Sequence, residues 1–302
     1  VSVGNKANAR GNSSIALGDG AVVQNDGGNR IVNNNSMAIG TAAKTVSSNN
    51  ATAIGHGAFV AKNSHSAIAV GESAQAGKEA ATAIGKEAAA KGKNSLAAGT
   101  SAVAEGENAV SVGQGTEAKG KNAVAIGNAS QTAGSSSVAV GDEAGAAAGR
   151  SVSVGIGAGK GMLGDILGTK GSHVSIGDEA GQNVDGQHDI AIGTKAGGNV
   201  SSNYNIAIGV EAGTNIGTAG NPSIGKNVSI GYNANKNTTL VSRLQATAVG
   251  SDTKAADDAL ALGFHAQAAG NGSIAAGFNA LAEDAASMAL GHQGSILISI
   301  IS

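Results

Sequence analysis

Two glycine-rich segments have the spacing of nucleotide-binding loops, and each lacks an essential part. Gly115–Asn122 reads GTEAKGKN, close to a P-loop, but the Ser or Thr that would hold magnesium is missing. Gly159–Gly164 reads GKGMLG, formally a G-x-G-x-x-G loop, but no strand–helix–strand pattern surrounds it. In a chain with 49 glycines such matches arise from composition. We predict neither a phosphate site nor a dinucleotide site.

The histidines and acidic residues do not form a recognisable metal site. The histidines are His56, His65, His173, His188, His265 and His292. They show no zinc-type spacing, although stacked repeats could bring His173 and His188 to one metal or anion. Acidic residues such as Asp178 and Asp257 match neither of two calcium patterns, the EF-hand and the RTX repeat. We therefore expect no catalytic residue, no cofactor and no metal, and a protein that is not an enzyme.

Composition is typical of an ordered repeat protein. Charged residues make up 13% and aromatic residues 2% of the 302 residues, and cysteine is absent. Without a G-X-Y period the glycines do not indicate collagen, and regularly placed aliphatic residues do not suit a disordered chain. The net charge of −2 gives no polybasic signature, so we expect no nucleic-acid partner.

A four-residue motif of apolar, small, apolar residue and glycine recurs along the chain. Examples are VSVG ending at Gly113 and VAIG ending at Gly127. These anchor glycines follow one another at 14 residues from Gly71 to Gly155, and again from Gly263 to Gly291. Because the side chains of a strand alternate between two faces, each copy predicts a strand with one Val/Ile face and one Ala/Ser face.

The small residue two positions before each anchor glycine defines what we call the small-residue face. In the regular part of the chain it consists of Ala83, Ala97, Ser111, Ala125, Ala139 and Ser153. A surface exposed to solvent tolerates side chains of any size. Uniformly small side chains are needed only where another backbone approaches closely. We therefore predict that this is the stacking face on which chains of a trimer meet.

A second short strand follows each anchor glycine and completes a coil. After Gly85, for example, Ala88 and Ala90 point one way and the residues between them point the other. Two strands and two turns make a 14-residue coil, and coils stack in parallel about 4.8 Å apart. The sequence thus predicts an all-β parallel β-roll or solenoid of about nineteen short coils. Its core of Ala, Val and Ile is thin, which favours oligomerisation.

In such a solenoid, residues at the same distance from successive anchor glycines stack on one another. At two such positions the charges alternate in sign from coil to coil. One series is Glu79, Lys93, Glu107 and Lys121, and the other is Lys91, Glu105 and Lys119. We predict that this charge ladder maintains the register of the coils more than it adds stability. The alternative is a mixed, solvated surface whose alternation is accidental.

The spacing divides the chain into regular and irregular parts. Residues 1–294 form one repeat domain, with regular coils in 1–155 and 250–294 and irregular coils with insertions in 156–249. Insertions are expected near 25–35, 162–167, 221–222 and 236–245, either as recognition loops or as neutral decorations. The segment 162–167 is expected to cap local apolar surface. Residues 295–302, SILISIIS, are expected to form a tail outside the solenoid.

Two segments carry a resemblance to a known family. Asn122–Ser130 reads NAVAIGNAS and Asn94–Gly99 reads NSLAAG. They are similar to the head repeat N-S-V-A-I-G-x-x-S of YadA-type trimeric autotransporter adhesins, and the resemblance covers nearly the whole chain. It implies a left-handed roll, a homotrimer around one axis, and a place on the bacterial cell surface at the outer membrane.

The function that this resemblance implies is attachment to host matrix proteins, glycans, cells or abiotic surfaces, and self-aggregation. The neck motif of the family is not recognisable, and Val1 begins inside a repeat. We therefore expect a fragment, with membrane contact only through a C-terminal anchor absent from this sequence. The x-x-A-G signature of the irregular coils is similar to trimeric phage tail fibres, so a fibre shaft or receptor-binding segment is the alternative. A monomeric ice- or polysaccharide-binding solenoid is a further alternative, although threonines are sparse.

Overall fold

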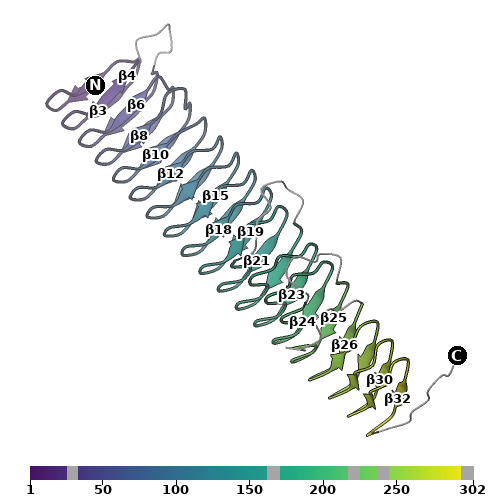
Figure 1. Cartoon of the computed structure of the whole chain (residues 1–302). Helices are drawn as coiled ribbons and strands as arrows, with labels where there is room; N and C mark the ends of the chain where they lie inside the picture. Colours follow the sequence, from purple (N-terminus) through teal and green to yellow (C-terminus); the bar gives the residue numbers. More distant parts are fainter. Residues whose placement is uncertain (26–32, 162–170, 217–224, 237–244, 294–302) are drawn as a thin grey trace. The chain divides into compact units, whose positions relative to one another are not determined.

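The computed structural model describes residues 1–25, 33–161, 171–216, 225–236 and 245–293 (Figure 1). The chain divides into two compact units, Val1–Asp142 (unit 1) and Glu143–Ser302 (unit 2). In both units short strands pair in parallel with the equivalent strands of neighbouring coils. The described residues contain no helix, and thus none long and apolar enough to cross a membrane.

Unit 1 consists of two parallel sheets, one for each strand of the coil. The strands that carry the anchor motif are β1 (Ser2–Val3), β3 (Ile15–Leu17), β5 (Met37–Ile39), β7 (Thr52–Ile54), β9 (Ile68–Val70), β11 (Thr82–Ile84), β13 (Leu96–Ala98), β15 (Val110–Val112), β17 (Val124–Ile126) and β19 (Val138–Val140). The second strands are β2 (Asn8–Ala9), β4 (Val22–Gln24), β6 (Lys44–Val46), β8 (Phe59–Val60), β10 (Gln75–Ala76), β12 (Ala89–Ala90), β14 (Val103–Ala104), β16 (Glu117–Ala118) and β18 (Gln131–Thr132). Ser111 pairs with Ala125, which is the predicted step of 14 residues.

Unit 2 has the same anchor strands but only part of the second sheet. Its anchor strands are β21 (Val152–Val154), β22 (Val174–Ile176), β23 (Ile190–Ile192), β24 (Ile206–Ile208), β25 (Val228–Ile230), β26 (Thr247–Val249), β28 (Leu260–Leu262), β30 (Ile274–Ala276) and β32 (Met288–Leu290). Its second strands are β20 (Gly145–Ala146), β27 (Lys254–Ala255), β29 (Gln267–Ala268) and β31 (Leu281–Ala282). Between β20 and β27, turns replace the second strand in the described residues.

The anchor strands number nineteen in the described residues, and the fold is an all-β parallel solenoid of about 18 turns. The prediction of a parallel β-solenoid is therefore confirmed. Register survives the insertions: Val152 pairs with Val174, and Ile190 pairs with Ile206. The predicted cap at 162–167, the pair 221–222 and the tail 295–302 lie outside the described residues, as do most of the insertions near 25–35 and 236–245.

The anchor glycines recur because no other residue fits the corner of the coil. Gly99 has a φ of +139°, a conformation that L-residues avoid. A Cβ built on Gly99 would lie 2.3 Å from the carbonyl oxygen of Gly113 in the next coil. Both the backbone conformation and the close stacking of coils therefore require glycine here.

The interior of the regular coils is filled mostly by alanine, with some serine and threonine. Ala83 on β11 and Ala88 and Ala90 on the return path of the coil are all fully buried. Unit 2 has a corresponding alanine cluster that includes Ala261 and Ala268. Small inward side chains allow the two walls of a coil to approach closely, so the fold buries much backbone and little side-chain volume.

Candidate functional site: surfaces and polar clusters

The small-residue face lies inside the coil, and this corrects the prediction that chains meet on it. Ala83, Ala97, Ser111, Ala125, Ala139 and Ser153 are all 0% exposed in the single chain. They stack in register with their neighbours, as Ala97 does with Ser111. The backbone that approaches them closely is the other side of their own coil, as where Ser111 Oγ donates to the carbonyl oxygen of Thr116 at 3.0 Å. The predicted close approach is present, but it is made within one chain.

The larger residues of the anchor strands instead face outward and form an apolar stripe on each unit. In unit 1, Leu17, Ile84 and Ile126 are 42%, 46% and 38% exposed. In unit 2, Ile176 and Leu262 are 40% and 47% exposed. Contiguous exposed apolar surface of this kind marks an interaction site in a soluble protein. The regular Val/Ile columns of the sequence were the signal for this surface.

Three residue pairs of the predicted charge ladder form ion pairs between neighbouring coils. Lys93 Nζ lies 2.8 Å from a carboxylate oxygen of Glu79. The hydrogen bond and charge of Lys93 lower the pKa of Glu79, and Glu79 in turn raises the pKa of Lys93. The other two contacts are Lys121–Glu107 at 3.1 Å and Lys91–Glu105 at 2.9 Å.

Lys119 departs from the ladder because it has a closer partner on its own coil. Its ammonium lies 2.6 Å from Glu117, two residues away on β16, rather than pairing with Glu105 of the preceding coil. Glu117, followed by the charge of Glu105, raises the pKa of Lys119. The function of the ladder in register stays a prediction.

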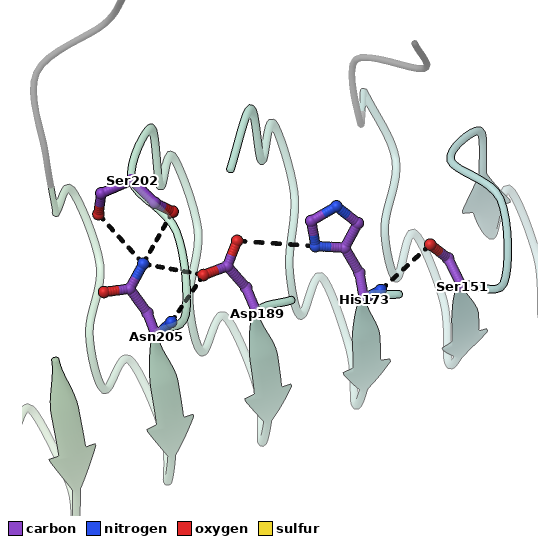
Figure 2. A network of polar contacts seen from close by, with 5 residues as sticks. All are labelled: Ser151, His173, Asp189, Ser202 and Asn205. Atoms are coloured by element: carbon purple, nitrogen blue, oxygen red, sulfur yellow. Dashed lines mark hydrogen bonds and ion pairs between the residues drawn. The ribbon is translucent and has the colours of Figure 1, made fainter. Parts of the chain in front are cut away.

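A column of buried polar side chains runs through the irregular coils of unit 2 (Figure 2). Ser151, His173, Asp189 and Asn205 each stand immediately before an anchor strand, where the regular coils have Ala or Ser. His173 N donates to Ser151 Oγ at 3.2 Å, and Asn205 donates from both N and Nδ2 to Asp189 Oδ1 at 2.8 Å. The second oxygen of Asp189 lies 3.6 Å from His173 Nδ1.

The environment of Asp189 favours its neutral form. Burial raises the pKa of this carboxyl to about 7, although the hydrogen bonds from Asn205 act in the opposite direction. Asp189 and His173 resemble an acid–base pair, but they are only 6% and 2% exposed, which leaves a dissolved substrate no access. The column therefore belongs to the interior of the fold. Stacking was expected at most to bring His173 and His188 to one metal or anion, whereas the ring of His188 is exposed and stacks on Tyr204 at 5.1 Å.

Side-chain amides in this column accept hydrogen bonds from backbone N–H groups of the next coil. Asn227 Nδ2 donates to Asn205 Oδ1 at 2.9 Å, and Asn227 Oδ1 accepts from the backbone N–H of Ala246 at 3.0 Å. Buried backbone groups need such partners. Asn33 does the same in unit 1, where its Oδ1 accepts from Ser48 N at 2.6 Å.

The x-x-A-G signature is part of a longer repeated turn, A-G-x-N followed by Val or Ile. Each asparagine has a left-handed backbone conformation, and the three side chains form a ladder of amides. Asn183 Nδ2 donates to Asn199 Oδ1 at 3.0 Å, and Asn199 Nδ2 donates to Asn215 Oδ1 at 2.9 Å. The following Val184, Val200 and Ile216 form a buried cluster. The turn thus places polar amides outside and apolar side chains inside.

A row of exposed rings lies on the last coils of unit 2. Phe264 stacks on Phe278 with ring centres 5.4 Å apart, and Phe278 stacks on His292 at 4.9 Å. Phe264 and Phe278 are 46% and 42% exposed. All three residues directly follow an anchor glycine, so coil stacking alone aligns them.

Comparison with known families supports the reading of the repeats. The family model described as the YadA head domain repeat matches more than half of the chain. The matched segments are residues 1–21, 33–58, 63–88, 90–116, 118–144, 256–280 and 268–293. The chain belongs to the YadA head family. No curated protein matches the chain.

The matched YadA head segments lie within the regular coils and do not include residues 145–255. The buried polar column and the A-G-x-N ladder both lie in that interval.

Proposed function

We propose that this chain is the head of a trimeric, surface-displayed bacterial adhesin that attaches to host matrix, cells or abiotic surfaces. The observation that carries the proposal is the YadA head match over the regular coils. Heads of this type are surface-exposed adhesin domains, which agrees with a location at the bacterial cell surface. Anchorage in the outer membrane is part of the same proposal.

The outward apolar stripe supports association of several chains. It carries Val, Ile and Leu, several of which are about 40% exposed, whereas the inward face is alanine and serine that are already buried. Burying apolar surface stabilises by about 25 cal/mol per Å², and the alanine core of a single coil leaves little surplus over the entropy of ordering. Association along the stripe would cover it in each unit.

Sedimentation equilibrium of the purified chain tests the trimer. We expect a mass three times the 28.7 kDa of one chain. The double variant Ile84→Lys/Ile126→Lys places charges on the stripe and should lower that mass. Gln131→Lys, on an exposed position of β18, is the matched control and should remain trimeric. A wild-type mass near 28.7 kDa at micromolar concentration would refute the trimer.

Adhesion is tested with beads that carry the purified chain at controlled density. We expect these beads to bind cultured cells, immobilised matrix proteins or plastic above the level of beads carrying an unrelated solenoid. Equal binding by both kinds of bead on every surface would refute the adhesin assignment.

A further inference from the structure

A polar hollow lies on unit 2 where turns take the place of the second strand. It extends over three A-G-x-N turns and the coil that follows, and its volume is about 240 Å³. Charged and amide side chains of these coils line it, together with Gly198. A hollow of about 240 Å³ can hold a small ligand or one unit of a polymer.

The absence of a side chain at Gly198 opens the hollow. The stacked positions on the neighbouring coils are Gln182 and Thr214, both of which carry side chains. A Cβ built on Gly198 would meet only one atom within 4 Å, the carbonyl oxygen of Lys195 at 3.8 Å. Unlike the anchor glycines, Gly198 is thus not required by close packing or by a left-handed conformation. Its effect is to leave space.

One wall of the hollow is charged, but its charges balance. Lys195 Nζ lies 3.4 Å from Glu179, and Lys236 forms an ion pair and hydrogen bond with Glu211. Two ammonium groups therefore face two carboxylates across successive coils. A polyanion would find no net positive charge here, and a cation would find no net negative charge.

The other wall is the amide ladder of Asn183, Asn199 and Asn215. Each side-chain amide has two N–H hydrogens and a carbonyl oxygen with two lone pairs. The two ladder bonds together use one N–H hydrogen of Asn199 and one lone pair of its oxygen. The central amide can therefore both donate to and accept from a ligand without breaking the ladder.

We infer that this hollow is a binding site for a neutral carbohydrate, such as one sugar unit of a polysaccharide or glycan. Sugar hydroxyls donate and accept hydrogen bonds, which matches amides, ammonium groups and carboxylates whose total charge is zero. The hollow has no aromatic or aliphatic side chain in its lining, which disfavours an apolar ligand. The inference rests on the proposed adhesin function and gives its ligand class.

Two variants test the site and keep the backbone conformation of the coil. Gly198→Gln fills the hollow with the side chain that Gln182 already has one coil away. Asn199→Gly removes the central amide and keeps the φ of +54°, which glycine adopts without strain. The matched control is Asn108→Gly in unit 1. Asn108 also has a left-handed φ, of +56°, and donates to Asn122 Oδ1 at 3.0 Å in an equivalent ladder.

The assay is an array of neutral and sulfated oligosaccharides, followed by saturation-transfer NMR and titration calorimetry with each neutral hit. We expect the wild-type chain to bind at least one neutral oligosaccharide. Asn199→Gly should weaken it about tenfold, the loss of roughly one hydrogen bond. Gly198→Gln should abolish binding, and Asn108→Gly should bind as the wild type does. Circular dichroism confirms that each variant is folded.

Three results would overturn the inference. They are no binding to any neutral oligosaccharide, binding to sulfated oligosaccharides alone, and equal loss in Asn108→Gly and Asn199→Gly. The bead assay separates this from the adhesin proposal. If wild-type beads adhere but no sugar binds, the head function stands and the carbohydrate site does not. If sugar binds but beads do not adhere, the carbohydrate site stands and the adhesin function does not.

Discussion

Replacing Asp189 by asparagine should stabilise the protein above neutral pH. The carboxyl is buried between His173 and Asn205, and its pKa is raised to about 7. At pH 8 the folded protein must bury a charge that the unfolded chain exposes to water at no cost. The amide of Asp189→Asn would keep an oxygen that accepts both N–H groups of Asn205, as Asp189 Oδ1 does at 2.8 Å. It would also add a third amide to the pair that Asn205 and Asn227 already form in the buried column.

The size of the effect follows from the pKa displacement. Because the folded pKa lies above the usual value of 3.8, the folded state binds more protons than the unfolded state between pH 3.8 and about 7. The stabilising contribution of the neutral carboxyl is fully present below pH 3.8 and is lost as the pH rises to about 7. At about 1.4 kcal/mol for each tenfold change in proton affinity, the loss approaches about 4 kcal/mol at pH 8.

The measurement is thermal unfolding followed by circular dichroism from pH 4 to pH 8.5, at one protein concentration because association shifts Tm. Asp189→Asn should melt on the order of 5–10 °C above the wild type at pH 8, and the difference should vanish near pH 4. The exposed Asp178→Asn is the control and should track the wild type throughout. A variant that melts below the wild type at pH 8 would show that Asp189 is ionised and paired with a protonated His173, which would refute this reasoning.

Further predictions concern the interior and the corners of the coil. Ala125→Leu should lower the free energy of unfolding by about 1–3 kcal/mol in chemical denaturation, because Ala125 is fully enclosed by its own coil. Val124→Leu, at an outward position of the same strand, is the control for Ala125→Leu and should change the free energy of unfolding little. Gly99→Ala should cost more than about 2 kcal/mol, since strain at φ +139° adds to a 2.3 Å clash with Gly113. Wild-type stability in Gly99→Ala would show that the coil corner relaxes freely.

The repeat architecture could be predicted because a solenoid is specified locally. A strand of three residues, a glycine corner and a step of 14 recur so often that one coil fixes the position of its neighbours. The register of Ser111 on Ala125 and the contact of Lys93 with Glu79 both follow from counting residues. The contact of Lys119 with Glu117 could not be predicted by counting residues, because the choice between two nearby carboxylates depends on side-chain rotamers.

The buried column and the hollow depend on what stands across the coil. Nothing in the sequence at His188 and Asp189 indicates that the first side chain faces solvent and the second faces His173. A shift of one residue in the alternation of the strand would exchange the two. Insertions of unequal length hide the alignment of His173, Asp189 and Asn205, whose spacing of 16 residues differs from the step of 14 in the regular coils. The open space at Gly198 is visible only when its stacked neighbours are known.

The sequence by itself determined the strands, the corners and the stacking of coils, because alternation and glycine act over a few residues. Tertiary structure decided which face is inside. An Ala/Ser face beside a Val/Ile face is compatible with either arrangement, and the usual preference for burying large residues points the wrong way here. The two walls of a coil are joined by short turns, so they can close only on small side chains, and the larger ones are left on the outside. That closure turned the predicted surface between chains into the core and left the apolar stripe for association.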